Sequence, residues 1–159
     1  MEHLGEFSTE DVFPFISTEK IKRDYQVGDK IYSVKMDSQR YHVFKANQAC
    51  VVCGLIGTKM ILDIHPRDRS PHFNLYGEEA GQLVLMTKDH ILAKSKGGNN
   101  LISNLQTMCS VCNGLKGNCG LTNAQVKELR CLCPAGQLPT KDHIRQKMLE
   151  YHSLQSVLV

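Results

Sequence analysis

Two cysteine pairs with the spacing of metal ligands are the most distinctive chemical feature of this sequence. Cys50 and Cys53 form one Cys-x-x-Cys pair, and Cys109 and Cys112 form a second. Two intervening residues let both sulfurs face one ion from a tight turn, and Zn²⁺ takes four such thiolates in a closed tetrahedron. Gly54 follows the first pair, where such a turn often needs a positive φ. The pattern predicts one shared structural zinc site, with buried free thiols as the alternative.

The remaining cysteines are Cys119, Cys131 and Cys133, which brings the total to seven. An odd number suits a disulfide framework poorly, and the N-terminal residues lack the basic start and apolar run of a secretory signal. No apolar stretch reaches the length of about 20 residues that a membrane helix needs. We therefore expect a reducing cytoplasm, no membrane partner, and three ordinary buried thiols. A second metal site at the Cys131-x-Cys133 pair is the alternative, although its spacing is unusual for zinc.

The second cysteine pair comes at the end of a strand, loop, strand and helix pattern. Residues 82–88 (QLVLMTK) are typical of a buried strand, and this strand leads directly into Asp89-His90. A long loop over 92–103 contains Gly97-Gly98-Asn99-Asn100, residues 104–108 predict a second strand, and a helix is expected to start at Cys109. The polar residues at the end of the first strand are thereby brought toward the helix that carries the second pair.

Other segments give weaker signals. Residues 30–36 alternate, with Tyr32, Val34 and Met36 on one face, and predict a strand. Residues 38–47 fit either a short helix or a hairpin. The first ~20 residues are acidic and polar, so we expect them to be loosely ordered.

The C-terminal part has helical signals. Thr122 and Gln125 have the form of a capping box, which predicts a helix start. A second helix is predicted after Pro139 with Thr140 as its cap. Its apolar stripe, which we expect to be core, is formed by Ile144, Met148 and Tyr151.

The stretch from Lys88 to Asn118 resembles the HNH endonuclease family. The residues that carry the resemblance are Asp89-His90, Gly97-Gly98, Asn104-Leu105-Gln106, Cys109-x-x-Cys112-Asn113 and Lys116. With the first cysteine pair, the resemblance covers less than half of the chain. It implies an α+β protein of bacterial or phage type with a ββα-metal core and two zinc knuckles. We place a β-containing N-terminal extension at 1–47, the nuclease core at 48–119 and a helical segment at 120–159, all within one compact domain.

The resemblance also implies roles for four residues. His90 is the expected general base, because imidazole can take a proton from water near neutral pH. Asp89 is the expected ligand of a divalent cation, and Asn104 is expected to hydrogen-bond across the loop and fix the His90 backbone. Asn113 stands where the family has its final histidine, which makes this an HNN version. An amide oxygen there favours a hard ion, Mg²⁺ or Mn²⁺, as the catalytic metal.

Several cations are candidates for phosphate contact. The formal net charge is +3 and the isoelectric point about 8.5, which is compatible with nucleic-acid binding without demonstrating it. Lys94 and Lys96 lie in the loop after His90, and Lys116 lies one helical turn after Asn113. A polar insertion over 65–81 either reaches DNA or forms a solvated hairpin. The side chains in it that could contact DNA are those of His65, Arg67, Arg69, His72 and Asn74.

The resemblance implies hydrolysis of DNA phosphodiester bonds to 5′-phosphate and 3′-hydroxyl ends. Two alternatives stay open: the same chemistry on RNA, and a zinc-stabilised nucleic-acid-binding module without catalysis. One ββα-metal site cuts one strand, so a monomer would nick, and a double-strand cut would need a homodimer or two events. The expected location is the cytoplasm of a bacterium or of a phage-infected host cell.

Overall fold

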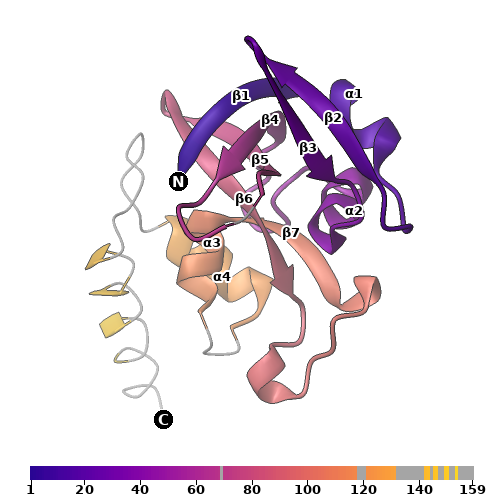
Figure 1. The fold of residues 1–159 in the computed structure, drawn as a ribbon. Coiled ribbons are helices and arrows are strands. Elements are labelled where there is room, and N and C mark those ends of the chain that lie inside the picture. Colours follow the sequence, from indigo (N-terminus) through magenta and orange to yellow (C-terminus); the bar gives the residue numbers. More distant parts are fainter. Residues whose placement is uncertain are drawn as a thin grey trace.

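The computed structural model describes residues 1–68, 70–117 and 121–131, and also residues 142, 143, 145, 146, 149, 150 and 153. A five-stranded antiparallel sheet with strand order β1-β4-β5-β6-β7 forms the centre, and a separate two-stranded sheet pairs β2 with β3 (Figure 1). The central strands are β1 (Glu2–Ser8), β4 (Gly57–Ile64), β5 (His72–Glu79), β6 (Gln82–His90) and β7 (Leu105–Cys109).

The N-terminal residues are part of the sheet, so the prediction that they are loosely ordered was wrong. β1 pairs antiparallel with β4 from Glu2 to Ser8, and Ser8 then forms a capping box with Asp11 that starts helix α1 (Thr9–Val12). Asp63 on β4 is fully buried and contacts the imidazole of His3 on β1. A buried carboxylate is stable only with partners, and here β1 supplies one of them.

The segment predicted as a polar insertion is a central strand. β5 lies between β4 and β6, its Phe73 and Leu75 are fully buried, and Asn74 is 3% exposed. Asn74 donates to Asp63 Oδ2 (2.7 Å) and therefore does not reach DNA. The segment is therefore neither an insertion nor a solvated hairpin, and DNA contact by its other polar side chains stays a prediction. The prediction failed because prolines before the strand and glycines in and after it are typical of turns. Gly77 lies within the strand because a Cβ there would be only 2.7 Å from the carbonyl oxygen of Ile56.

Strand β6 changes partners along its length. It pairs with β5 from Gln82 to Leu85 and with β7 from Met86 to His90. Helix α2 (Gln39–Ala46) covers the place where β5 and β6 separate, and it contacts both β6 and β7. The helical alternative for residues 38–47 is therefore confirmed.

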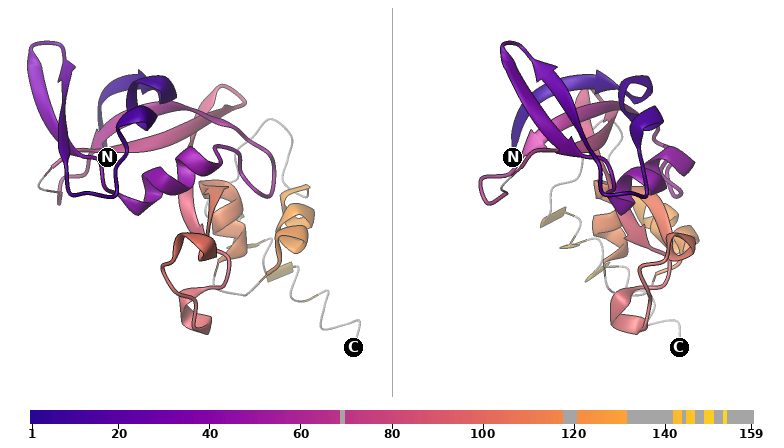
Figure 2. Two further views of the ribbon diagram at one scale, coloured as in Figure 1. Left: turned by 90° about the vertical axis from the view of Figure 1, so that its right-hand side faces the viewer. Right: turned by 45° about the vertical axis from the view of Figure 1, so that its right-hand side comes forward.

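The strand, loop, strand and helix pattern is also confirmed. β6 leads into a loop with 3₁₀ turns at Lys94–Lys96 and Ile102–Asn104, β7 returns, and helix α3 (Ser110–Lys116) follows. The loop projects from the rest of the molecule, while α2 and α3 flank the β6–β7 pair on either side (Figures 1 and 2). This ββα unit is what places the polar residues of β6 beside α3.

Helix α4 (Asn123–Cys131) packs against α3 and starts as predicted. The Gln125 Oε1 atom accepts from the Thr122 backbone N–H (2.9 Å), and Thr122 Oγ1 accepts from Gln125 N–H (3.3 Å), which completes the capping box. The predicted helix after Pro139, its cap and its apolar stripe involve residues outside the described part of the chain.

The core joins the hairpin of β2 (Lys22–Val27) and β3 (Lys30–Lys35) to the central sheet. The predicted strand over 30–36 is confirmed as β3; on its apolar face Val34 and Met36 are fully buried and Tyr32 is partly exposed. Tyr25 meets Phe73 edge-to-face with 4.7 Å between ring centroids. No helix among the described residues has the length and apolar character to cross a membrane.

Candidate active site

The four predicted zinc ligands lie together. All four sulfur atoms, from Cys50, Cys53, Cys109 and Cys112, lie within 4.8 Å of one another, and the Cys53 and Cys109 sulfurs are 3.8 Å apart. A tetrahedral zinc site with Zn–S bonds of about 2.3 Å has sulfurs about 3.8 Å apart. Three of the cysteines are buried and Cys53 is exposed. Both the donor set and its size therefore fit one structural zinc ion.

Local backbone geometry brings the two pairs together. Gly54 has the predicted positive φ, +78°. Its N–H donates to the carbonyl of Cys50 (2.9 Å) and closes the turn that holds the first cysteine pair. Val51 N–H donates to the carbonyl of Thr107 (3.1 Å) and so fixes this turn to β7. The second pair lies where β7 becomes α3, with Cys109 as the N-cap of the helix.

The thiols of the cluster perturb one another. Hydrogen bonds from Cys109 and Cys112 lower the pKa of Cys50, and they lower the pKa of Cys53 to about 7. Contact with Cys109, and then with the first pair, raises the pKa of Cys112. Four neighbouring sulfurs cannot all carry a charge unless a cation is present, and a dication would allow all four to ionise.

Cys131 lies apart from this cluster. It is an exposed thiol at the end of α4, so the prediction of a buried thiol was wrong for this residue. The helix end is not buried because α4 turns its Val126 and Leu129 to the core instead. Cys119 and Cys133 lie outside the described residues.

Three of the four predicted catalytic residues line a second feature, a pocket of about 410 Å³, and Asn104 is not among its lining residues. It lies between the end of β6, the loop that follows, and α3. Asp89, His90 and Asn113 all line it, although they come from two different elements. The other lining residues are Lys88, Ala93, Lys94, Ser95, Lys116 and Gly117.

Asp89 is buried in this pocket and has charged and polar partners. Its Oδ2 atom accepts hydrogen bonds from Lys116 Nζ (2.5 Å) and from Gln106 Nε2 (2.7 Å). Lys116 is 5% exposed and also donates to the carbonyl of His90 (2.6 Å). The sequence predicted that Lys116 meets a phosphate, but its ammonium is already held inside the site, so that contact stays a prediction.

The imidazole of His90 has an orienting partner. Its Nε2 atom lies 2.9 Å from Oδ1 of Asn100, an acceptor, so the tautomer with the proton on Nε2 satisfies this contact. The carbonyl of Asn100 accepts in turn from Gln39 Nε2 (2.7 Å) on α2. In this arrangement the Nδ1 atom of His90 keeps its lone pair available as a base.

Asn104 connects the two sides of the loop. Its Oδ1 accepts from Leu92 N–H (2.9 Å), and its Nδ2 donates to the carbonyls of Leu92 (3.2 Å) and Asn99 (2.9 Å). Its own carbonyl accepts from Ile91 N–H (2.9 Å), next to His90. Asn104 therefore hydrogen-bonds across the loop, and one of these bonds reaches Ile91, the residue after His90; its role in fixing the His90 backbone stays a prediction.

Asn113 lies on the first turns of α3 and faces the same pocket. Its Nδ2 donates to Thr87 Oγ1 (3.0 Å), so its amide oxygen has no donor among the described residues. Since Cys112 precedes it, the thiolate cluster and the pocket share one short helix. A metal held by the cysteines would therefore fix the position of Asn113.

The remaining predicted phosphate contacts are separated by the structure. Lys94 lines the catalytic pocket, whereas Lys96 is exposed beyond it in the same 3₁₀ turn. Arg67 is exposed in the turn between β4 and β5 and does not line the pocket, and Arg69 is outside the described residues.

Sequence reasoning missed three supporting residues. Asn100 was treated only as part of a turn, and Gln39 lies in a helix that had been left ambiguous. Gln106 was noted within the motif but was given no role, although it lies opposite Asp89 in the β6–β7 register. Aligning the two predicted strands antiparallel would have placed this amide beside Asp89.

Comparison with known proteins gives one match. Residues 78–122 match a family model described as HNH endonuclease. No curated protein and no solved structure matches this chain. The matched segment runs from the last residues of β5 to the residue before α4, is similar to HNH endonuclease domains, and contains the pocket and the second cysteine pair. The first pair and helix α2 lie outside the matched residues.

Proposed function

We propose that the protein is a metal-dependent endonuclease that hydrolyses DNA phosphodiester bonds. The observation that carries the proposal is that Asp89, His90 and Asn113 line one pocket inside an HNH domain. In this proposal His90 is the general base, and Asp89 and Asn113 hold a divalent cation. Asn104 is a positioning residue that holds the His90 backbone through the loop.

The oxygen atoms in the pocket fit a hard divalent cation. Both hydrogen bonds to the Asp89 carboxylate go to Oδ2, so Oδ1 has no donor among the described residues, and the same is true of Oδ1 of Asn113. A carboxylate and an amide oxygen are ligands that suit Mg²⁺ or Mn²⁺. When bound, such a cation neutralises charge on the scissile phosphate and on the departing oxygen.

In this proposal His90, oriented by Asn100, takes the proton of the attacking water. Asn100 holds Nε2 of His90, which directs the Nδ1 lone pair toward a water in line with the scissile bond. As the water oxygen bonds to phosphorus, Nδ1 takes its proton, the bond between phosphorus and the 3′ oxygen breaks, and solvent protonates that oxygen. Lys94 at the pocket rim attracts the phosphate.

Two alternatives to a DNA endonuclease can be tested separately. RNA presents the same phosphodiester, so the same residues would serve it. A binding module without catalysis would keep the zinc cluster and the cations but would show no turnover. The presence of the whole set Asp89, His90 and Asn113 in one pocket favours the enzyme.

A supercoiled-plasmid assay tests the proposal. We expect nicked circles to accumulate with Mg²⁺ or Mn²⁺ and not without an added divalent ion. A brief EDTA treatment should stop the reaction, and excess Mg²⁺ alone should restore it, because the four-thiolate zinc site exchanges slowly compared with an oxygen-ligand site. A parallel reaction on labelled RNA of matched length separates the two substrates.

Each result of this assay has a defined meaning. Restoration that requires Zn²⁺ as well as Mg²⁺ would mean that EDTA acted on the structural site. Absence of cleavage of either nucleic acid with any divalent ion, by a protein that binds DNA, would replace the enzyme with the binding module.

The ion pair between Lys116 and Asp89 leads to a separate prediction. Replacing Lys116 with methionine keeps much of its volume but leaves the buried Asp89 carboxylate without its cation. Breaking one partner of a buried pair costs about 3–5 kcal/mol, so the free energy of unfolding should fall by roughly that amount in the absence of divalent ions. Urea denaturation with and without Mg²⁺ measures it.

The Mg²⁺ arm of this experiment tests the metal ligand. We expect Mg²⁺ to restore part of the lost stability in Lys116→Met, because a cation at Asp89 replaces the missing charge. Lys59→Met is the matched control, since Lys59 is paired with Glu6 (3.4 Å) at the surface, where ion pairs contribute at most about 1 kcal/mol. Equal losses in both variants would contradict the prediction.

A further inference from the structure

We propose that a cationic groove leads from the catalytic pocket across helix α2 to the β2–β3 hairpin, and that it binds backbone phosphates of the DNA flanking the cut. The proposal rests on the proposed function for the catalytic pocket and extends it to residues outside the HNH domain. The residues that define the groove are Lys88, Arg40 and Lys35.

The groove is a series of cavities that share cationic residues. Lys88 lines both the catalytic pocket and the cavity of about 190 Å³ where β5 and β6 separate. Arg40 lines that cavity and also the largest described pocket, which measures about 530 Å³. Lys35 lines that pocket and a further cavity that also contains Lys20 and Lys22. The residue shared at each of the first two junctions is a cation, and the third junction is shared by Lys35 and Asp37.

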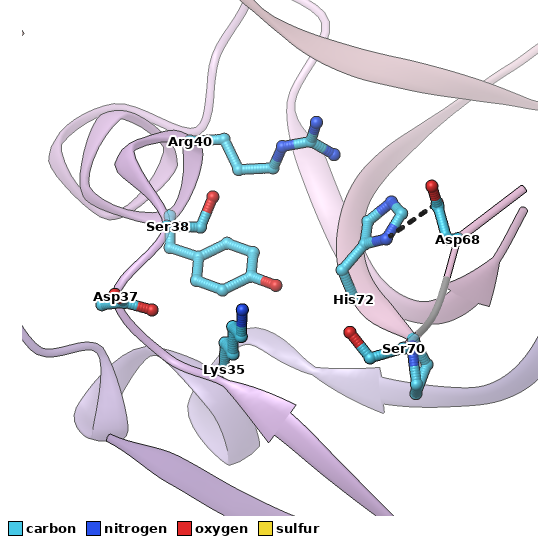
Figure 3. Close-up of a pocket in the computed structure, with 9 residues that line it drawn as sticks. Lys35, Asp37, Ser38, Arg40, Asp68, Ser70 and His72 are labelled. Carbon is cyan, nitrogen blue, oxygen red and sulfur yellow. Dashed lines mark ion pairs between the residues drawn. The ribbon is translucent and has the colours of Figure 1, made fainter. Parts of the chain in front are cut away.

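The largest described pocket lies between the start of α2 and the start of β5, and two cations, Lys35 and Arg40, together with the imidazole of His72 point into it. Figure 3 shows Arg40 extending from α2, His72 from β5 and Lys35 from below, all toward the same space. The hydroxyls of Ser38 and Ser70 also line the pocket. A phosphate is recognised by this combination of cations and hydroxyl donors.

The cations of the groove have no carboxylate partner. None of Lys35, Arg40 and Lys88 forms an ion pair among the described residues. Two carboxylates line the largest pocket: Asp68, which lies 3.7 Å from His72, and Asp37. Cations that remain unpaired along a groove favour an external anion.

Arg40 is held in place by a buried network. Its guanidinium donates to Asn74 Oδ1 (2.5 Å), and the same amide donates to the fully buried Asp63 (2.7 Å). An arginine fixed in this way loses little conformational freedom when it binds a phosphate. Its position between the cavities is therefore part of the fold.

The electrostatics along the groove agree with this path. Burial lowers the pKa of Lys88, and the neighbouring Arg40 and Lys94 lower it further. Burial and then Arg40 also lower the pKa of His72. Arg40 thus lowers the pKa of a neighbour on each side, while Asp68 and Asp63 raise that of His72.

DNA binding measured against salt concentration tests the groove. A labelled duplex of about 30 base pairs is titrated without added divalent ions, using wild type, Arg40→Gln and Lys35→Gln. Each lost phosphate contact should reduce the slope of log Kd against log salt by about 0.9, and it should weaken binding several-fold at low salt. Lys35→Gln guards against misfolding, because the Lys35 side chain has no hydrogen-bond or ion-pair partner in the described part of the chain, whereas Arg40 contacts Asn74.

Lys30→Gln is the matched control. Lys30 and Lys35 are the two end residues of the same strand, and only Lys35 lines the groove. We expect Lys30→Gln to bind as wild type does. If both groove variants bind as wild type, or if Lys30→Gln loses as much as Lys35→Gln, the groove is overturned.

The outcomes separate this inference from the proposed function. Nicking by wild type together with unchanged binding by the groove variants would overturn the groove alone. Weakened binding by the groove variants, with no nicking by wild type in any divalent ion, would overturn the enzyme and retain the groove. The same titration with RNA shows whether the phosphates belong to DNA or to RNA.

Discussion

Replacing His90 with alanine is expected to lower the rate of DNA nicking by about 10²- to 10⁴-fold, the usual contribution of a general base. The reason is that no other imidazole among the described residues lines the pocket, so the attacking water would have to lose its proton without a positioned acceptor. DNA binding and thermal stability should stay close to those of wild type, because His90 is half-exposed. Single-turnover nicking of a supercoiled plasmid measures the effect.

Two further variants sharpen this test. Asn100→Ala removes the acceptor from Nε2 of His90 and should give an intermediate loss, because the base is still present but is less well oriented. His65→Ala is the control, since His65 is exposed in the turn after β4 and does not line the pocket. Nicking by His90→Ala at the wild-type rate would remove His90 from the mechanism.

The second large effect is expected at the cysteine cluster. Replacing Cys112 with alanine should remove bound zinc and abolish cooperative unfolding of the ββα unit. Structural zinc sites in small domains contribute about 10–16 kcal/mol, which equals or exceeds the whole stability of a typical domain of about 5–15 kcal/mol. Zinc content by elemental analysis and thermal unfolding by circular dichroism measure the two parts.

Cys131→Ala provides the matched control, because Cys131 is an exposed free thiol outside the cluster. This variant should keep one zinc ion per chain and the wild-type melting temperature. Activity should fall in Cys112→Ala as well, since Asn113 depends on the same helix for its position. Purified wild type without zinc, or a Cys112→Ala protein that melts as wild type does, would exclude a structural metal here.

Local patterns were sufficient for the ββα unit. The apolar run before Asp89 predicted β6, the glycines after it predicted the loop, and the cysteine spacing predicted the turn at Gly54 and the start of α3. These features depend on residues close together in sequence, so periodicity and turn chemistry specify them. The cysteine pairs could be joined across a long separation because four thiols have few other uses in a reducing compartment.

The prediction failed where partners distant in sequence decide the structure. β1 looked loosely ordered because its residues are polar, but pairing with β4 and burial of Asp63 beside His3 fix it in the sheet. β5 looked like an insertion because its turn residues were more visible than the apolar side chains between them. Strand propensity depends strongly on the neighbours that the sheet supplies, and a single sequence does not contain that information in readable form.

The sequence by itself determined which residues can do chemistry: the four thiols, the Asp89-His90 pair and the amide of Asn113. Their types and order are local properties, and they were sufficient to indicate a zinc site and a resemblance to HNH endonucleases. Only the tertiary structure decided how these residues are supported. In the folded chain Lys116 and Gln106 hydrogen-bond to Asp89, and Asn100 hydrogen-bonds to His90. Arg40 lies between the catalytic pocket and the N-terminal hairpin. Except for Asn100, these contacts join different elements, so they exist only once the sheet and the helices have packed.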